Sequence, residues 1–270
     1  MKNLKEQLTW ENEYNNLLEH KLLQDAFITV IPENVEPKER KIFSKILTQV
    51  YLHKRMSIPT IVGCIRNSCG SAQEASNMIV RAINNKWVLF DFNRKEVLVK
   101  YAPKKEIVEK MEQFQFPPPL LCKPNYIRKN TDSAYYSVKV DNIILNQKYL
   151  PKDKKIDACL DHINRMNQVE FKLNMDVVDA IDNHWEGTMH PKKGETPEDF
   201  NKKVKAFQKY DRNAHHLIKM IEDTGNRFHL AHHYDKRGRI YSQGYYINYQ
   251  GNDWCKACIE FADEEYLNND

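Results

Sequence analysis

The sequence predicts a mainly helical α+β protein of 270 residues. Apolar residues recur every three to four positions over most of the chain, which is typical of amphipathic helices, whereas a few short apolar runs between turn residues are typical of strands. The segments with the helical period are 3–27, 37–54, 58–66, 72–83, 103–114, 153–168, 173–186 and 197–223. The pattern also predicts a last helix, capped by Asn252 or Asp253 and running to Phe261.

The proline run at 116–119 divides the chain. Phe116 is followed by Pro117, Pro118 and Pro119, which end the helix at 103–114 because proline lacks the amide proton that a helix requires. The run either joins a first domain over 1–115 to a second domain over 116–270, which is the division we expect, or is an ordered entry to the next strand.

The first domain contains a segment of winged-helix type. Two helices, 58–66 and 72–83, precede a predicted hairpin at 87–101, and such modules often bind DNA through the second helix or the wing. The second helix carries one basic residue, Arg81, so a lobe with only packing duties is the stronger interpretation.

Extended structure is also predicted in the second domain. Residues 134–145 alternate in part and indicate a hairpin arm. Residues 227–234 and 240–249 read as extended segments on either side of a tight loop at 235–239.

Composition excludes several classes of protein. No apolar run approaches the roughly 20 residues that span a bilayer, and the N-terminus lacks a signal-peptide pattern, so we expect an intracellular protein without a membrane partner. Six cysteines are too sparse for a disulfide scaffold. Cys255 and Cys258 form a single C-x-x-C, for which structural thiols on one helix face are a better interpretation than metal ligands. No phosphate-binding glycine loop and no H-E-x-x-H metal motif occurs, so no metal site is expected in this chain.

Basic residues concentrate in the second domain. Lys and Arg exceed Asp and Glu by 41 to 37 in the whole chain and by 12 to 7 within 191–240. In the helix at 197–223 the cations follow alternating steps of three and four, which places them on one face: Lys202, Lys205, Lys209, Arg212, His216 and Lys219. Such a ridge suits a phosphate backbone. Solvated helix faces are usually charged too, but of mixed sign, whereas this ridge is expected to be single-signed.

The loop Asp235-Lys236-Arg237-Gly238-Arg239 is a second candidate site. Gly238 permits a sharp turn, Arg237 and Arg239 are forked donors suited to phosphates, and Asp235 can hold one arginine in position. On the pattern alone, an ordinary surface hairpin with solvated charges is the stronger interpretation.

Two sequence blocks resemble the single-subunit RNA polymerases of podoviruses, mitochondria and chloroplasts. The first is D-x-x-G-R, formed by Asp235, Gly238 and Arg239 and followed by Tyr241. The second is Q-G-N-D-x-x-K, which comprises Gln250, Gly251, Asn252, Asp253 and Lys256. The blocks occur in the family's order and spacing, and the likeness extends over about 110–263.

The resemblance implies a fold and a role. The fold would be a reduced N-terminal domain plus the start of the palm and thumb-side core of a right-hand polymerase, completed by a partner chain. Arg239 would contact template DNA and the RNA–DNA hybrid beside the active centre, with Gly238 shaping the loop and Asp235 bracing it. Lys256 would contact nucleic acid nearby. Lys209, Arg212 and His216 would contact the template backbone, and Arg237, Lys202 and Lys205 complete the expected nucleic-acid-binding set.

The sequence departs from the family in one respect. The family's catalytic aspartates, which hold two Mg²⁺ ions, follow the Q-G-N-D block, and no aspartate here has a matching context. No catalytic residue is therefore expected in this chain, which alone should not polymerise. The aspartates and most of the Mg²⁺ contacts would belong to a larger palm and fingers subunit, unless the chain is a truncated polymerase.

Among such split enzymes, the chain resembles the small subunit of the heterodimeric polymerase of N-four-like podoviruses. That likeness implies phage transcription in the cytoplasm of an infected bacterial host. It also suggests that a recruiting single-strand-binding factor is a further partner. Two rivals remain: a non-enzymatic DNA-binding protein of winged-helix type, and a scaffold whose basic ridge binds an acidic partner. Salt dependence separates nucleic-acid binding from the scaffold.

Overall fold

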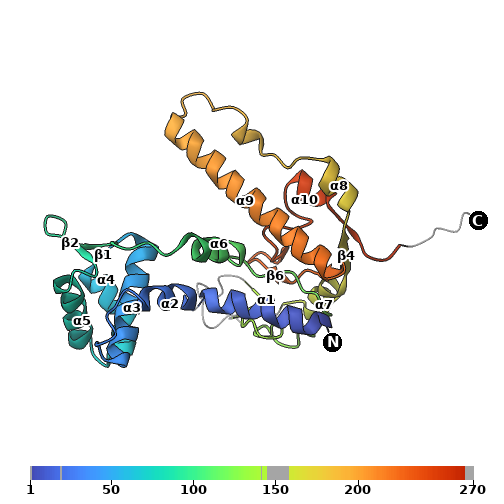
Figure 1. Ribbon diagram of the computed structural model, residues 1–270. Coiled ribbons are helices and arrows are strands. Elements are labelled where there is room, and N and C mark those ends of the chain that lie inside the picture. The colour runs from blue at the N-terminus through green and yellow to red at the C-terminus, as the bar shows by residue number, and fades with distance from the viewer. Residues whose placement is uncertain (1, 19, 141, 145–157, 265–270) are drawn as a thin grey trace, which may run out of the picture. The chain divides into compact units, whose positions relative to one another are not determined.

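The computed structural model describes residues 2–18, 20–140, 142–144 and 158–264 (Figure 1). Helices and short antiparallel strands make up an α+β fold, which confirms the predicted class. Tertiary contacts divide the chain into a smaller unit, Asn16–Glu112, and a larger unit formed by Met1–Asn15 with Gln113–Asp270. None of the described helices is long and apolar enough to cross a membrane.

The smaller unit has the element order of a winged helix. Its elements are α2 (Lys21–Ile28), α3 (Pro37–His53), β1 (Arg55–Ser57), α4 (Ile58–Cys69), α5 (Ala72–Asn84), β2 (Leu89–Asp91), β3 (Glu96–Leu98) and α6 (Lys105–Gln113). The three strands form an antiparallel sheet in the order β1-β3-β2. The sequence pattern did not predict β1, because three residues with one buried side chain, Met56, give no recognisable alternation. Pairing of Met56 with Val97 specifies the strand instead.

Local signals and one apolar core hold this unit together. Ser57 and Ser71 cap α4 and α5 by accepting hydrogen bonds from the amides of Thr60 and Glu74. The core contains side chains from every helix between α2 and α5, among them Phe27, Phe43, Ile46, Ile61, Ile65 and Ile79.

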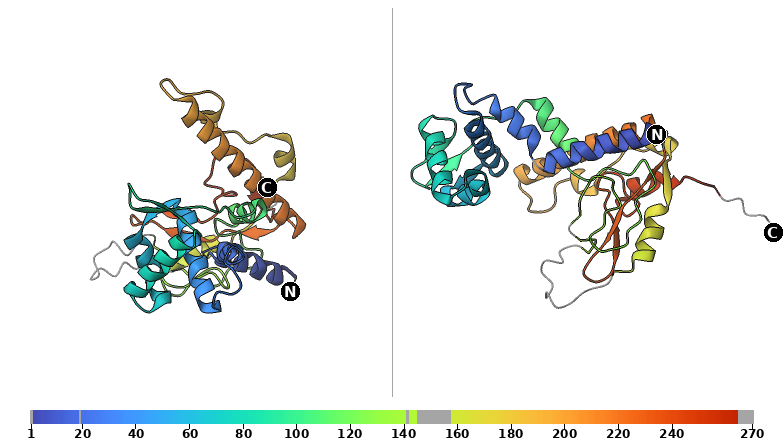
Figure 2. Two further views of the ribbon diagram at one scale, coloured as in Figure 1. Left: turned by 60° about the vertical axis from the view of Figure 1, so that its left-hand side comes forward. Right: turned by 90° about the horizontal axis from the view of Figure 1, so that it is seen from below.

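The larger unit contains a long helix, which projects from the other elements, and two small sheets (Figure 2). Its elements are α1 (Lys2–Leu18, with its first fourteen residues in this unit), α7 (Leu160–Gln168), β4 (Glu170–Leu173), α8 (Met175–Ala180), the 3-10 turn η2 (Glu186–Thr188), α9 (Pro197–Asp223), β5 (Phe228–His229), β6 (His232–Tyr234), β7 (Ile240–Ser242), α10 (Asp253–Ala257) and β8 (Ile259–Phe261). One sheet has the antiparallel order β5-β4-β8, and β6 pairs with β7 as a hairpin.

The N-terminal helix packs into the larger unit through buried polar side chains. Gln7 accepts a hydrogen bond from the amide of Leu121 and donates one to Glu11 at 2.9 Å. Glu11, which is fully buried, accepts hydrogen bonds from the backbone amides of Tyr136 and Ser137. Residues 1–15 therefore group with residues 113–270, not with the rest of the predicted domain 1–115.

The predicted single helix at 3–27 is interrupted. His20 has φ 55°, in the left-handed region, and separates α1 from α2. The apolar residues on the two sides belong to different cores: Trp10 packs in the larger unit, and Leu23 and Phe27 pack in the smaller one. A helical period continues across the break because each half satisfies the pattern separately.

Two predictions near the C-terminal end are wrong. The helix expected through Phe261 ends at Ala257, and Ile259–Phe261 form β8, which pairs with β4 through Leu173 and Ile259. The helix expected over 173–186 ends at Ala180, and the carbonyl of Ile181 accepts a hydrogen bond from the indole of Trp254. In both places a partner distant in sequence overrides the local pattern.

The predicted hairpin arm at 134–145 is also wrong for the described residues 134–140 and 142–144. They form no strand, and Ala134, Tyr135 and Val138 pack into a core of the larger unit. The segment expected to be extended over 240–249 ends as a strand at Ser242. Residues 153–157 of the helix predicted at 153–168 lie outside the described residues. Residues 158 and 159 are not helical, and α7 begins at Leu160.

His232 makes the stability of the larger unit depend on pH. Its ring is buried between the Asn167 amide oxygen, at 2.9 Å from Nδ1, and the Tyr249 hydroxyl, at 2.8 Å from Nε2. Burial lowers the pKa of His232 from 6.5 to about 4. The unfolded chain therefore binds more protons between those values, and stability decreases as the pH falls from 6.5 towards 4.

We expect the free energy of unfolding to decrease by roughly 2 kcal/mol between pH 7 and pH 5 through this residue. Urea unfolding followed by tryptophan fluorescence measures it. His232→Gln should remove that share of the pH dependence. An identical pH profile in wild type and His232→Gln would contradict the assignment.

Candidate nucleic-acid interface

The loop at 235–239 is the tip of the β6–β7 hairpin. Its backbone closes through hydrogen bonds from the Asp235 amide to the Arg239 carbonyl at 2.8 Å and from the Gly238 amide to the Asp235 carbonyl at 3.0 Å. Gly238 has φ 80° and open space around its Cα, so backbone conformation alone explains the glycine there.

Asp235 organises the two arginines. Its Oδ1 accepts hydrogen bonds from the amides of Arg237 and Arg239, and its Oδ2 accepts one from Arg239 Nε at 2.7 Å. Desolvation opposes ionisation, but the hydrogen bonds and charge of Arg239 outweigh it and hold the pKa of Asp235 below its usual range. The carboxylate is therefore charged at neutral pH and fixes the loop.

The arginines present their guanidinium groups outward. The Arg237 side chain is 71% exposed and that of Arg239 is 53% exposed. Arg239 also lies over the ring of Tyr241, 5.5 Å from its centroid, which restrains it further. A forked donor on a rigid turn, with Nε already bonded, suits a phosphate oxygen approaching from solvent.

The second block, 250–256, is a structural joint. The side-chain amide of Gln250 accepts a hydrogen bond from the Ser242 amide and donates one to the Ile240 carbonyl. It therefore hydrogen-bonds to the backbone of β7, as a neighbouring strand would. Asn252 caps α10 by accepting from the Cys255 amide. Lys256 is 53% exposed and pairs with Asp253 at 3.1 Å, which leaves the lysine at the surface where a phosphate could compete for it.

The same segment contacts α9. The Tyr210 hydroxyl lies 3.0 Å from Cys255 Sγ and 3.3 Å from the Tyr246 carbonyl. Asn183 bridges Asp211 of α9 to Asn252 through its amide. The structure therefore brings the hairpin and α9 together through residues 242–256, although the loop and the basic face lie on different elements. Asn183 and Asp211 gave no sequence signal, because their roles depend on tertiary contacts.

The basic face of α9 has the predicted composition in its middle. Thr196 caps the helix and Pro197 opens it. Lys205, Arg212 and His216 are exposed, and Lys209 is partly buried. The residues on the core side include Tyr210, Ala214, Ile218 and Ile221.

At both ends the face is not single-signed as expected. Lys202 pairs with Asp199 at 3.0 Å, and Lys219 pairs with Glu222 and Asp223 at 3.0 and 2.9 Å. Capping explains the N-terminal acids, because carboxylates are favourable in the first helical turn. The positive stretch is therefore shorter than the sequence indicated and centres on residues 205–216.

His216 differs chemically from the lysines. Partial burial lowers its pKa, so it is mainly neutral at pH 7. It contributes a hydrogen-bonding group at the edge of the face more than a charge.

The cysteine pair lies in the interior. Cys255 and Cys258 are both fully buried, and burial raises the pKa of each thiol, that of Cys258 to about 12. Within the described ranges no group of three or more His, Cys, Asp or Glu side chains is arranged to hold a metal ion.

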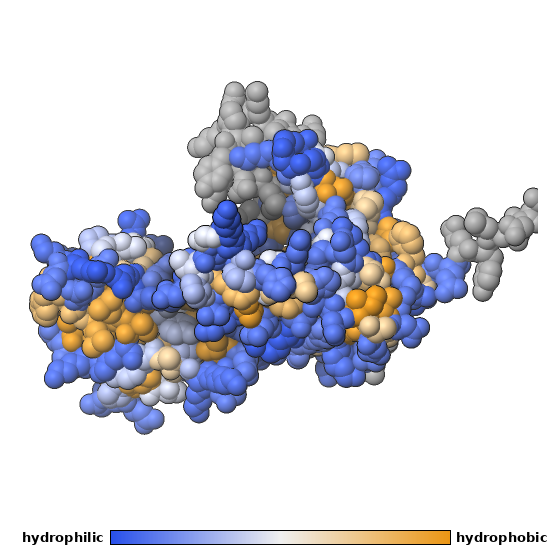
Figure 3. Space-filling model, turned by 90° about the horizontal axis from the view of Figure 1, so that it is seen from above, coloured by the Kyte–Doolittle hydropathy of each residue, from blue (hydrophilic) through white to orange (hydrophobic). Residues whose placement is uncertain are grey.

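The smaller unit offers little positive charge on α5. The basic residue of α5, Arg81, is engaged by Glu39 in a bidentate pair. The exposed positions on α5 are Ala72, Gln73, Glu74, Asn77, Val80, Arg81 and Asn84. Apolar patches interrupt the hydrophilic surface of this unit (left in Figure 3), whose exposed large side chains include Val80, Leu89 and Phe92. This composition does not favour groove reading by α5.

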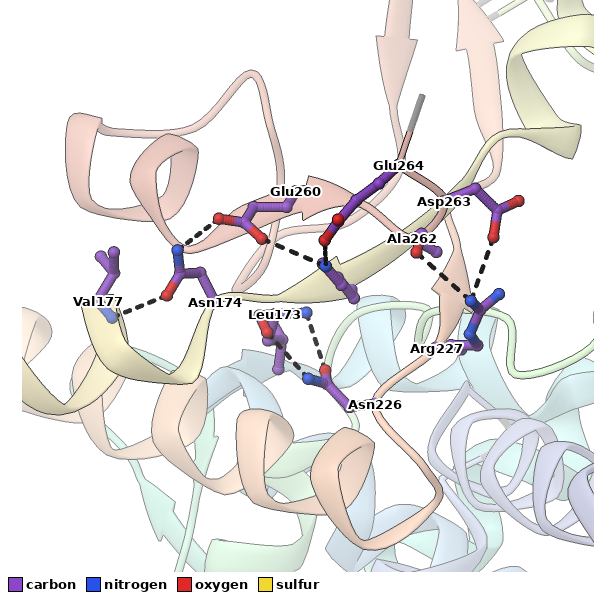
Figure 4. Close-up of polar contacts among 10 residues, drawn as sticks. Leu173, Asn174, Val177, Asn226, Arg227, Glu260, Ala262, Asp263 and Glu264 are labelled. Atoms are coloured by element: carbon purple, nitrogen blue, oxygen red, sulfur yellow. Dashed lines mark hydrogen bonds and ion pairs between the residues drawn. The ribbon is translucent and has the colours of Figure 1, made fainter. Parts of the chain in front are cut away.

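Polar contacts connect the β5-β4-β8 sheet with the residues that follow α9 (Figure 4). Asn226, just after α9, accepts from the Leu173 amide and donates to its carbonyl, at 2.8 and 2.9 Å. Arg227 pairs with Glu170 and with Asp263. The end of α9 and the start of β5 are thereby tied to the central strand.

Comparison with known proteins finds similarity over about half of this chain. No family model matches the chain. A protein of Agaricus bitorquis described as "Probable DNA-directed RNA polymerase" is 30% identical over 160 residues, which cover 53% of this chain and 14% of that protein. A protein of Gelasinospora sp. (strain G114) with the same description is 29% identical over 139 residues, 52% of this chain and 15% of that protein.

The chain is thus related, distantly, to DNA-directed RNA polymerases. The matched segments span only 14% and 15% of the length of these relatives.

Gly251 should be essential to the joint at 250–256. A Cβ at this position would lie 2.9 Å from the Asn248 carbonyl oxygen and 3.0 Å from Cys255 Cβ. We expect Gly251→Ala to destabilise the larger unit by about 1–3 kcal/mol. Gly187→Ala is the matched control, because a Cβ there would meet nothing within 4 Å and the φ of Gly187 is not positive. Equal urea midpoints for the two variants would argue against a close-packed joint.

Proposed function

We propose that this chain is the template-binding part of a DNA-directed RNA polymerase of the single-subunit type. The observation that carries the proposal is the coupling of two cationic elements within one unit. The braced arginines of the hairpin tip and the basic face of α9 both depend on residues 242–256 for their positions. Similarity to DNA-directed RNA polymerases supports the same function independently.

Each named residue has a role in this proposal. Arg239, braced by Asp235 and positioned by Gly238, contacts the template and the RNA–DNA hybrid, with Arg237 reinforcing it. Lys205, Lys209, Arg212 and His216 follow the template backbone, whereas Lys202 and Lys219 must exchange their carboxylate partners to do so. Lys256 contacts nucleic acid beside the hairpin.

The complete enzyme requires further parts. We propose that the catalytic aspartates and Mg²⁺ belong to a larger palm and fingers subunit. The setting would be phage transcription in the cytoplasm of an infected bacterium, with a single-strand-binding factor recruiting the enzyme to its template. The partner surface of this chain would lie on the larger unit, because that unit carries the polymerase-like blocks.

The alternative of a non-enzymatic winged-helix protein has one supporting observation, the element order of the smaller unit. The composition of α5 weighs against it, because Arg81 is held by Glu39.

The basic face of α9 should determine the salt dependence of binding. Each lysine or arginine that neutralises a phosphate of a single strand contributes about 0.7 unit to the slope of log affinity against log salt. Lys209→Ala combined with Arg212→Ala should therefore reduce the slope for single-stranded DNA by about 1.4 units. Titrations by fluorescence anisotropy at several salt concentrations measure this.

Lys203→Ala is the control on the same helix. Lys203 follows Lys202 by one residue, about 100° round the helix, and pairs with Glu195. Its removal should leave the slope unchanged. A slope that is the same in all three proteins would mean that nucleic acid does not follow this face.

Templated ribonucleotide incorporation tests the enzymatic role. We expect incorporation on single-stranded DNA with Mg²⁺ when this chain is co-expressed with the product of the neighbouring gene, and none with this chain alone. Arg239→Ala should abolish incorporation while leaving assembly of the pair intact. Activity of this chain by itself would refute the division of labour, and full activity of Arg239→Ala would remove the loop from the mechanism.

A further inference from the structure

Tyr245 is an exposed aromatic side chain on a rigid support. Its ring stacks on Phe116, with centroids 3.8 Å apart and an interplanar angle of 17°. It meets the rings of Tyr210 and Tyr246 edge-on at 5.6 and 5.1 Å. Tyr245 is nevertheless 47% exposed, whereas Tyr210 and Tyr246 are 8% and 4% exposed. One aromatic of the cluster is therefore turned towards solvent.

The backbone beneath Tyr245 has little freedom. A Cβ on the preceding residue, Gly244, would lie 2.4 Å from the Ile247 carbonyl oxygen, so the chain passes too closely for any other residue. Asn248 donates a hydrogen bond to the Gly244 carbonyl at 2.7 Å. A ring held this firmly loses little conformational entropy when a ligand binds to it.

A pocket beside Tyr245 opens next to the basic face of α9. Its lining includes Phe116, Pro117 and Tyr245 together with His216 and Met220 of α9. His216 lies one turn beyond Arg212, and residues four apart are neighbours on a helix surface. A strand whose phosphates follow Lys205, Lys209 and Arg212 would therefore reach this pocket at the end of the positive stretch.

We propose that Tyr245 is a stacking platform for one unpaired nucleobase of single-stranded DNA. This inference rests on the proposed function and adds to it the form of the bound nucleic acid. Positively charged tracks combined with exposed aromatics are typical of single-strand binding, because every base offers a flat face for stacking. A base within a duplex is already stacked on its neighbours and offers no free face. The site consequently favours a separated template strand over a duplex.

An abasic ligand tests the platform in the wild-type protein. Binding of a fluorescent 12-nucleotide single strand is measured by anisotropy with all bases present and with all bases removed, because a strand could shift its register past one missing base. Loss of the bases should weaken binding about tenfold, since a stacked base contributes on this order. In Tyr245→Leu the same removal should have no effect, because the ring that recognises the base is gone.

Matched variants separate stacking from folding. Tyr245→Phe keeps the ring and should bind like wild type, and Tyr245→Leu should bind single strands about tenfold more weakly with an unchanged salt slope. Tyr126→Leu removes a tyrosine of similar exposure, 54%, elsewhere in the larger unit and should have no effect. Duplex DNA of the same sequence should bind Tyr245→Leu and wild type equally.

The outcomes distinguish the two levels of the proposal. Salt-dependent binding without any effect of Tyr245→Leu, or of the abasic strand, would overturn the platform and leave the proposed function intact. No binding of single strands by the wild type would overturn both. If Tyr245→Leu instead prevented assembly with the larger subunit and left single-strand binding unchanged, the pocket would be a protein contact and the platform would be refuted.

Discussion

The candidate interface depends on one buried contact, between the Tyr210 hydroxyl of α9 and the segment that contains Tyr246 and Cys255. Desolvation raises the pKa of both the Tyr210 hydroxyl and the Cys255 thiol, so the contact is made by neutral groups. A neutral, hydrogen-bonded joint has no charge to desolvate, and it can lie within an apolar core. Through it the long helix and the hairpin keep a fixed relation, with Gln250 completing the connection to β7.

The helix α9, the turn at Gly238 and the Asp235–Arg239 pair could be predicted from the sequence, because each depends on residues close together in the chain. Thr196 and Pro197 mark the start of α9, and the apolar period of the helix follows for its whole length. Gly238 indicated a turn, and its φ of 80° is the conformation for which glycine is needed. The bracing of Arg239 by Asp235 was likewise expected, since the two are four residues apart within one tight loop.

The remaining features depend on partners that are distant in the chain. Ile259–Phe261 continue a helical pattern in sequence, yet the open edge of β4 makes them a strand. Gln250 and Gly251 were recognisable as a block but not as a joint, because their partners are a backbone edge and a carbonyl oxygen. Acids at each end of α9 alter its charge in a way that a count of lysines does not reveal.

The attachment of α1 has a consequence for biosynthesis. Glu11 becomes buried only when its partners Tyr136 and Ser137, 125 and 126 residues later, have left the ribosome. At about 5–20 residues per second this delay is roughly 6–25 seconds. The contacts of Asn16–Glu112 lie within a shorter stretch that emerges first. Trp10 and Glu11 of α1 therefore stay exposed to water during this interval, in which the smaller unit can already fold.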